Sequence, residues 1–363
     1  MCSLIVLLMG GWLLVACSDD GSDASQADRL RLLSATRADG HEHISSENIR
    51  LFVTTADGKP SPGTFTYDAT QGWTTSSATV RENTQYYFYG FWPADAASAT
   101  STISASAPEL AGNYSKGADL ILYDLPPFSD KDICVIVGVK KVESTEPANA
   151  EHTTPTEGSY GFYAGMSGTN YVNLLMDHLY TQLQLQFCVD SEYYALRRIV
   201  VKKVSLTTSF GKTVNATVRL RAGNSAALTG AGLVDYKTGT SGPQTYALLK
   251  ETDTPLDLVE APAAGASTPA YSTVSPIYCP HRMLTNSGEY LSVETTYDVY
   301  TVTDAGEKGR LVRENCVAQN KIQTNRDGLP GMRMKFTLTV EPTYLYVLAD
   351  PDLDNPTVVV KSE

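Results

Sequence analysis

The sequence predicts an all-β protein built from stacked β-sandwiches, and three features of the chain lead to this fold class. Apolar and polar residues alternate with a period of two along much of the chain, as in strands that bury one face. These runs are bounded by Gly, Pro, Asn and Asp, which form turns. Helical periodicity is nearly absent, and the best short candidate is residues 191–197, with Ser191 as its cap. Many short strands without helices are typical of packed sheets.

The clearest strand is predicted at residues 182–189. Leu183, Leu185, Phe187 and Val189 alternate there with polar residues and Cys188, so one face of this strand should be buried. Further strands are predicted at residues 30–36, 49–54, 85–92, 119–123, 133–139, 198–207, 214–221, 290–302, 334–340, 344–348 and 357–361.

The N-terminus predicts export. Residues 4–16 form an uncharged apolar run that is too short for a spanning helix, which needs about 20 apolar residues, but has the length of a signal-peptide core. No basic residue precedes the run, which departs from the usual pattern. The run ends in small residues before Cys17, the predicted lipidation site of a lipoprotein. Residues 1–16 are therefore a predicted signal peptide, and residues 17–28 a flexible acidic tether.

Composition limits the classes of function. The formal net charge of the 363 residues is −12, which argues against nucleic-acid binding. Charged residues make up only 19% of the chain while tyrosine reaches 21 residues, as is typical of an extracellular β-protein. The length favours two domains. The polar stretch at 143–159 precedes the clearest strand, so we place the division there, with domains at 29–160 and 161–363; residues 252–276 are a second Pro-containing loop.

Cysteine and histidine positions indicate neither a metal centre nor a catalytic site. Four cysteines follow the tether without the spacing of a zinc site. Cys279 and Cys316 are the first candidates for a disulfide, since an oxidising compartment permits one, whereas the other two lie in apolar strands and are expected to be free. The pair His41 and His43 lies in a polar loop, and a lone His178 is expected to be structural. No motif of a hydrolase, nucleotide-binding protein or zinc protease is present, so we expect no enzyme, no metal and no cofactor.

Two other segments have a structural and a functional interpretation. Residues 350–356 carry oxygen ligands at alternate positions but lack the glycine and closing glutamate of a calcium loop, so a turn is expected. Tyr86, Tyr87, Tyr89 and Trp92 lie on one predicted strand and form either a sugar-binding platform or a strand that is half core and half surface; we favour the second.

Several segments in this order resemble the fimbrillins, the type V pilins of the Bacteroidales, in the broad group of minor fimbrillins. The predicted lipidation site, Cys17, and the acidic residues that follow it are also similar to the surface-export tag of Bacteroidetes lipoproteins. The segments that carry the resemblance span most of the chain and are residues 14–17, 30–37, 48–54, 86–93, 177–187 and 342–357.

The resemblance implies a fold and an assembly mechanism. It implies two tandem transthyretin-like β-sandwich domains after the tether, export to the outer membrane as a lipid-anchored precursor, and cutting by an Arg-specific surface protease after the first strand. Loss of that strand exposes unpaired backbone groups, which a strand from another fimbrial subunit then fills. The implied partners are therefore other subunits, the protease, the outer membrane and a host or bacterial surface ligand.

Arg37 is the predicted cleavage site, because it follows the strand at 30–36 and precedes a polar loop that a protease can reach. Arg29, Arg31 and Arg50 compete, but the first two lie before or within the strand and the third lies inside the next one. The removed strand would carry the apolar residues Leu30, Leu32, Leu33 and Ala35.

Three functions remain open at this stage. The first is a fimbrial subunit in an accessory or tip position rather than in the shaft. Residues 357–361 follow a proline turn closely, so they are expected to be the domain's own last strand rather than a donor strand. The second is a monomeric surface lipoprotein that binds glycans, and the third is an unrecognised hydrolase. Cutting at Arg37 distinguishes the first from the second, since a glycan-binding lipoprotein has no reason to lose its first strand.

Overall fold

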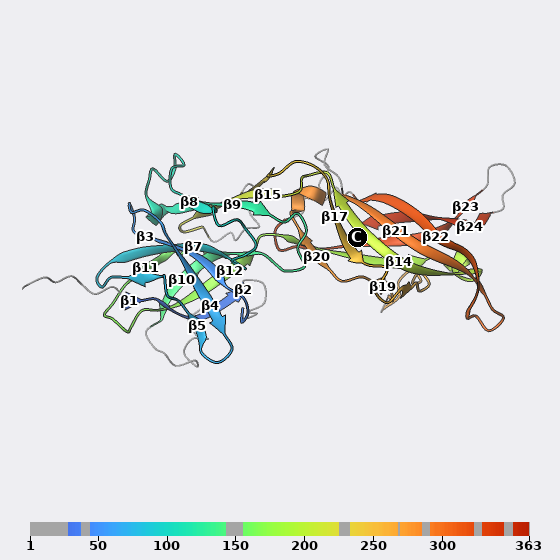
Figure 1. Cartoon of the computed structure of the whole chain (residues 1–363), viewed down its shortest axis with the longest axis horizontal. Helices are drawn as coiled ribbons and strands as arrows, with labels where there is room; N and C mark the ends of the chain where they lie inside the picture. The colour runs from blue at the N-terminus through green and yellow to red at the C-terminus, as the bar shows by residue number, and fades with distance from the viewer. Residues whose placement is uncertain are drawn as a thin grey trace, which may run out of the picture.

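Almost every regular element of the chain is a strand, so the predicted all-β fold is confirmed. The computed structural model describes residues 28–37, 44–142, 155–224, 233–267, 269–284, 291–322, 329–344 and 351–362. Figure 1 shows these strands in two lobes along the long axis, which we call the N-terminal lobe and the C-terminal lobe. The predicted signal peptide, and the tether as far as residue 27, lie outside the described residues.

The N-terminal lobe is built on one large curved sheet. Its strands, in the order in which they pair, are β2 (Arg31–Arg37), β12 (Tyr171–His178), β10 (Cys134–Val142), β7 (Gln85–Trp92), β3 (Ile49–Thr54), β4 (Ser61–Asp68) and β5 (Gly72–Thr74), with β11 (Gly161–Tyr163) beside β7. β2 runs parallel to β12, whereas the other neighbours are antiparallel. Gly90 of β7 is required for this pairing, because a Cβ there would lie 2.1 Å from the Arg50 carbonyl oxygen of β3.

A second, four-stranded sheet packs on this lobe, and half of it comes from later in the chain. Its strands, in order, are β16 (Val234–Thr238), β15 (Val214–Arg221), β9 (Gly117–Leu125) and β8 (Thr102–Ser104). β15 pairs with β9 from Val214 opposite Leu125 to Arg221 opposite Gly117. The β15–β16 hairpin is therefore part of the N-terminal lobe, although it follows strands of the C-terminal lobe in sequence.

The C-terminal lobe is a sandwich of two sheets. The first contains, in order, β19 (Ser272–Thr273), β13 (Thr181–Val189), β23 (Arg333–Tyr344) and β24 (Pro351–Ser362), with β20 (Ile277–Cys279) beside β13. The second contains β17 (Gln244–Leu249), β14 (Arg197–Thr208), β21 (Leu291–Val302) and β22 (Lys308–Ile322), with β18 (Leu256–Asp257) beside β14. The last strand, β24, pairs antiparallel with β23 of its own lobe, as expected for residues 357–361.

This pairing corrects the predicted division between residues 160 and 161. β12 lies after that position but belongs to the first sheet, and the chain changes lobe between His178 and Thr181. It changes lobe again between β14 and β15, and once more between β16 and β17. The polar stretch at 143–159 lies in sequence between β10 and β11, which belong to the same sheet, so it does not separate two domains.

Smaller elements complete the chain. β1 (Asp28–Arg29) pairs with β6 (Thr79–Val80) as a separate short sheet. Two 3₁₀ turns span Tyr114–Lys116 and His281–Leu284. The predicted short helix is α2 (Ser191–Tyr194), but its cap is Asp190 rather than Ser191, because the Asp190 carboxylate accepts from the N–H groups of Glu192 and Tyr193.

The alternation in β13 predicted its buried face correctly. Leu183, Leu185, Phe187 and Val189 are all buried in the main core. The aromatic strand β7 is mostly core, with Tyr89 and Trp92 buried and Tyr86 and Tyr87 half-buried, so it is no exposed platform. The turn expected at 350–356 is wrong for its described part, because Pro351 and Asp352 pair with β23.

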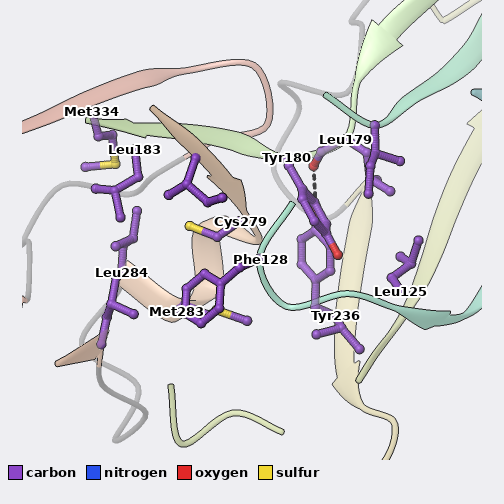
Figure 2. Close-up of a cluster of buried hydrophobic side chains, with 14 of the residues drawn as sticks. Leu125, Phe128, Leu179, Tyr180, Leu183, Tyr236, Cys279, Met283, Leu284 and Met334 are labelled. Atoms are coloured by element: carbon purple, nitrogen blue, oxygen red, sulfur yellow. Dashed lines mark hydrogen bonds between the residues drawn. The ribbon is translucent and has the colours of Figure 1, made fainter. Parts of the chain in front are cut away.

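The main core continues from one lobe into the other. Figure 2 shows this junction, where Phe128, Tyr180, Tyr236 and Met283 come from four separate parts of the chain. The Tyr180 hydroxyl donates to the Pro126 carbonyl oxygen at 2.8 Å, and the Tyr236 hydroxyl donates to the Leu179 carbonyl oxygen. Burial raises the pKa of both phenols well above the ordinary value, so both stay neutral donors. The two lobes therefore share one apolar core rather than a flexible linker.

Candidate functional site: the leading segment and its groove

The leading segment, residues 28–37, bridges two edges of the N-terminal lobe. On one side β1 pairs with β6, and the Leu30 N–H donates to the Ala78 carbonyl oxygen at 3.0 Å. One residue later the chain changes partner, and the Arg31 N–H donates to the Asn170 carbonyl oxygen at 2.9 Å, just before β12. From there β2 is an edge strand, whose strand partner is β12.

The segment buries its apolar residues in a second, smaller core. Leu30, Leu32 and Ala35 are 2%, 4% and 1% exposed, and they pack with residues of β3, β4, β7, β10 and β12. The ladder with β12 shifts register between Leu32 and Ser34, so Leu33 is the extra residue and is only half-buried. Three of the four predicted strand residues therefore fill this core, and removing them would open an apolar groove.

A cavity of about 700 Å³ borders the leading segment. Residues 29–35 form one wall, and the hairpin residues 71–75 form another, together with Ile44, Tyr67 and Tyr171. Trp73 and Tyr67 meet edge to face with their ring centres 5.1 Å apart. A strand between a ladder and a cavity has fewer packing partners than a strand inside a sheet, so it can leave at a lower cost.

Polar contacts fix the start of the segment against the loop before β12. The Asp28 carboxylate accepts from the Gly168 N–H at 2.8 Å and from the Asn170 side-chain amide at 3.0 Å. The Arg31 guanidinium donates to the Gly168 carbonyl oxygen at 2.9 Å and to the Tyr171 hydroxyl at 3.0 Å. Burial alone would raise the pKa of Asp28, but the hydrogen bonds from Gly168, Asn170 and neighbouring groups outweigh it and lower that pKa.

We expect the docking of the leading segment to weaken in acid. Because the pKa of Asp28 is lower in the folded chain than its ordinary value of 3.8, its contribution to stability is present above that value and is lost as the pH falls through the folded pKa. Asp28→Asn should lower the free energy of unfolding by about 1 kcal/mol at pH 6, with the difference shrinking towards pH 3. Urea unfolding at both pH values measures this. The exposed Asp57→Asn is the control, and an equal difference at both pH values would contradict the expectation.

Arg37, the predicted cleavage site, is the last residue of β2 and lies opposite Met176 of β12. Its side chain is only 16% exposed, with Nη1 3.6 Å from Oδ2 of Asp132, whose side chain is 2% exposed. The guanidinium carbon also lies 5.3 Å from the centre of the Trp92 ring, within the range of a cation–π contact. Trp92 is itself held by a hydrogen bond from its indole N–H to the Ser46 carbonyl oxygen at 2.9 Å. Arg37 therefore lies within the strand, with its side chain mostly buried, rather than after the strand as the sequence predicts.

We call Asp132, His178 and Trp92 the Asp132 socket. The Asp132 carboxylate contacts His178 Nδ1 directly and accepts a 3.5 Å hydrogen bond from the Cys134 thiol. Burial raises the pKa of that thiol well above its usual range, and the nearby Asp132 charge adds to the effect, so the thiol stays protonated. The sequence did not predict that His178 and Asp132 would meet.

Asp132, Cys134 and His178 also form a group of metal-ligand types, with ligand atoms within 4.8 Å of one another. The sequence held a signal for it, because Cys134 begins one strand and His178 ends another, and antiparallel pairing brings the two opposite each other. Arg37 already supplies the charge that balances Asp132, so the intact chain has no need of a cation there.

The remaining predicted site residues do not meet at this groove. Cys17, His41 and His43 lie outside the described residues. The candidate disulfide is wrong, because Cys279 and Cys316 are both free thiols. They lie on β20 and β22, in different sheets of the C-terminal lobe, and their distance in the sequence gave no measure of their distance in space.

Comparison with known proteins finds relatives only among solved structures. No family model and no curated protein matches the chain. Solved structures that match it over most of its length are described as fimbrial or cell adhesion proteins, the class that the sequence resembles. Among the described residues, no helix has the length and apolar character needed to cross a membrane.

Three of these structures illustrate the likeness. A fimbrial protein from Bacteroides vulgatus has a TM-score of 0.42 and 12% identity, covering 93% of this chain and 98% of that one. A putative cell adhesion protein from Bacteroides fragilis has a TM-score of 0.41 and 10% identity, covering 93% and 98%. The fimbrial anchor protein Mfa2 from Porphyromonas gingivalis has a TM-score of 0.33 and 8% identity, covering 93% and 96%. These values are too low to establish a shared function, so we base the function on the leading segment and its groove.

Proposed function

We propose that this chain is a structural subunit of a cell-surface fimbria, in an accessory or tip position. In this proposal the chain is exported as a lipoprotein through Cys17 and reaches the outer membrane as a lipid-anchored precursor. An Arg-specific surface protease cuts after Arg37, and a strand of another subunit replaces the leading segment. The assembled fimbria supports adhesion to a host or bacterial surface ligand.

The observation that carries this proposal is the position of the leading segment between two strand edges. Its loss would unpair the backbone of β12 on one side and of β6 on the other. It would also uncover the core under Leu30, Leu32 and Ala35. An unpaired edge beside an apolar groove is a template for an incoming strand, because the strand restores the ladder and buries the apolar surface at once.

We expect an Arg-specific protease to convert the precursor into a chain with Ala38 at its N-terminus whose groove accepts a strand added in trans. Because Arg37 is 16% exposed and paired with β12, the cut requires the end of β2 to open. It should therefore be slower than cutting at the exposed Arg29. N-terminal sequencing measures the cut, and binding of a labelled peptide with the sequence of residues 28–37 measures whether the groove accepts a strand.

Arg37→Lys is the matched control for this experiment. It keeps the positive charge beside Asp132 but removes the site that an Arg-specific protease recognises. The variant should lose at most its tether and should not bind the peptide. Binding of the peptide by the variant, or no binding by the wild-type chain after a complete cut at Arg37, would contradict assembly by strand replacement.

A second function, glycan binding by a monomeric surface lipoprotein, is favoured by the cavity beside the leading segment. Trp73, Tyr67 and Tyr171 line it together with the polar Gln71 and Arg31, and aromatic rings with a few polar groups are the usual lining of ligand sites. Because residues 29–35 form one wall, this function needs the leading segment in place. A chain that resists the protease and binds a glycan only when intact would favour it over the first.

A further inference from the structure

Loss of the leading segment would leave a buried charge behind. The proposed cut falls after Arg37, so Arg37 departs with the segment while Asp132 stays two residues before β10, with its side chain 2% exposed. Among the described residues, the Oδ1 atom of Asp132 is buried and has no hydrogen-bond partner even in the intact chain. The carboxylate therefore depends on its other oxygen, Oδ2, which contacts Arg37, His178 and Cys134.

The charges identify what must replace Arg37. In the intact chain, the permanently charged partner of the Asp132 carboxylate is the Arg37 guanidinium, and the His178 imidazole and a thiol that burial keeps neutral lie beside it. Without Arg37 the buried carboxylate keeps only the His178 imidazole, which carries a charge only when it is protonated, so the loss of the guanidinium is strongly unfavourable. The Trp92 ring 5.3 Å from the Arg37 guanidinium presents the negative face of its π-system, which also attracts a cation. A carboxylate and an indole ring together discriminate against neutral and acidic side chains.

We propose that the Asp132 socket selects an incoming strand with an arginine or lysine at the position that Arg37 occupies. This inference rests on the proposed function, because it names the partner that the emptied groove accepts. The partner is an extended strand of another subunit, with aliphatic or small residues in place of Leu30, Leu32 and Ala35 and a basic residue at its end. The basic residue also fixes the register of the strand, because a slip by one position turns it to the opposite face.

A divalent cation is the competing occupant of the socket. Asp132, Cys134 and His178 offer one carboxylate, one thiol and one imidazole within 4.8 Å. Zinc bound by a thiolate and a carboxylate would balance both charges once Arg37 has left. The position between two strand edges and the existing fit of a guanidinium favour the basic side chain, and the experiment includes zinc as a separate outcome.

The first arm of the experiment uses the full-length precursor and needs no cleavage. Hydrogen exchange of residues 31–37 is compared in the wild type, Arg37→Lys, Arg37→Gln and the same variants combined with Asp132→Asn. Arg37→Lys should stay within about threefold of the wild-type exchange rate, and Arg37→Gln should exchange at least about tenfold faster. Asp132→Asn should remove the difference between lysine and glutamine. Equal protection in Arg37→Gln and Arg37→Lys would overturn the proposal.

The second arm uses the precursor after the cut at Arg37 and labelled decapeptides with the sequence of residues 28–37. Peptides that end in arginine or lysine should bind at least about tenfold more tightly than peptides that end in glutamine or glutamate. Tight binding of the glutamine peptide, either alone or after addition of zinc chloride, would overturn selection by a basic residue, and the second result would assign the socket to a metal. Failure of the cut itself would contradict the proposed function while the first arm still decides the preference of the socket.

Discussion

A fragment that ends at residue 180 is expected not to fold, although it contains every strand of the first sheet. It lacks the β15–β16 hairpin, so β9 loses its ladder with β15 and the second sheet of the N-terminal lobe is halved. The lost side chains Val214, Val218, Leu220 and Tyr236 are all buried. Each contributes about 1.5–3 kcal/mol, so together they approach the whole stability of a typical domain, about 5–15 kcal/mol.

Circular dichroism and urea unfolding of the fragment, with the full chain as reference, measure this effect. The fragment should show no cooperative transition. Addition of a second fragment that begins at residue 181 should restore one, because it supplies the missing hairpin. A fragment of residues 1–180 that unfolds cooperatively by itself would contradict the dependence on β15–β16 and would show that the N-terminal lobe folds from one continuous stretch of the chain.

Leu32→Asp is expected to release the leading segment while the rest of the chain stays folded. Leu32 is 4% exposed, lies opposite Val172 and packs in the smaller core. A carboxylate there loses the apolar contact and is buried without a partner, at a cost of several kcal/mol. Because β2 is an edge strand, detachment of the segment relieves this cost without breaking the other ladders.

Hydrogen exchange and protease kinetics detect the release. Protection of residues 31–37 should fall by at least about a hundredfold, which corresponds to about 2.7 kcal/mol, and the cut after Arg37 should become correspondingly faster. Ser34→Asp is the matched control, since Ser34 lies on the same strand, borders the cavity and is half-buried. Loss of protection throughout the N-terminal lobe would show that the segment cannot leave independently.

The strands that sequence alone located are those with clear alternation or a dense apolar run. β3, β7 and β15 have the bounds that the pattern predicts, and β13 differs by one residue. β12 was missed because both of its faces are buried, so it shows no alternation. β22 was missed for the opposite reason, because most of its fifteen residues are exposed or half-buried. The period-two pattern therefore identifies a strand only when one of its faces is buried and the other is exposed.

The sequence pattern could not predict which strands pair with each other. Alternation indicates which side of a strand is buried but does not say which strand lies next to it. The pairing of β15 with β9 joins residues about a hundred positions apart, and no local signal marks it. The order of sheets, and with it the division into lobes, therefore required the structure.

The candidate site was partly accessible from sequence. The apolar residues of the leading segment and the arginine that follows them can be read from consecutive positions, and Leu30, Leu32 and Ala35 are buried as expected for such a strand. The Asp132 socket was not accessible in this way, because Arg37, Asp132 and His178 are far apart in the chain. They meet only because β2, β10 and β12 lie side by side.

The chain crosses between the lobes three times, and these crossings determine how the molecule resists a pulling force. Any tension between the lobes is shared by residues 178–181, 208–214 and 238–244, so no single connection carries the whole load. Val214 and Thr238, which pair with each other, lie at the end of the hairpin nearest those connections, and β15 runs away from them along β9. A pull towards the C-terminal lobe therefore loads the hydrogen bonds of this ladder in shear, all together rather than one after another. The hairpin acts as a mechanical clamp, and extension of the molecule requires this ladder to rupture as a unit.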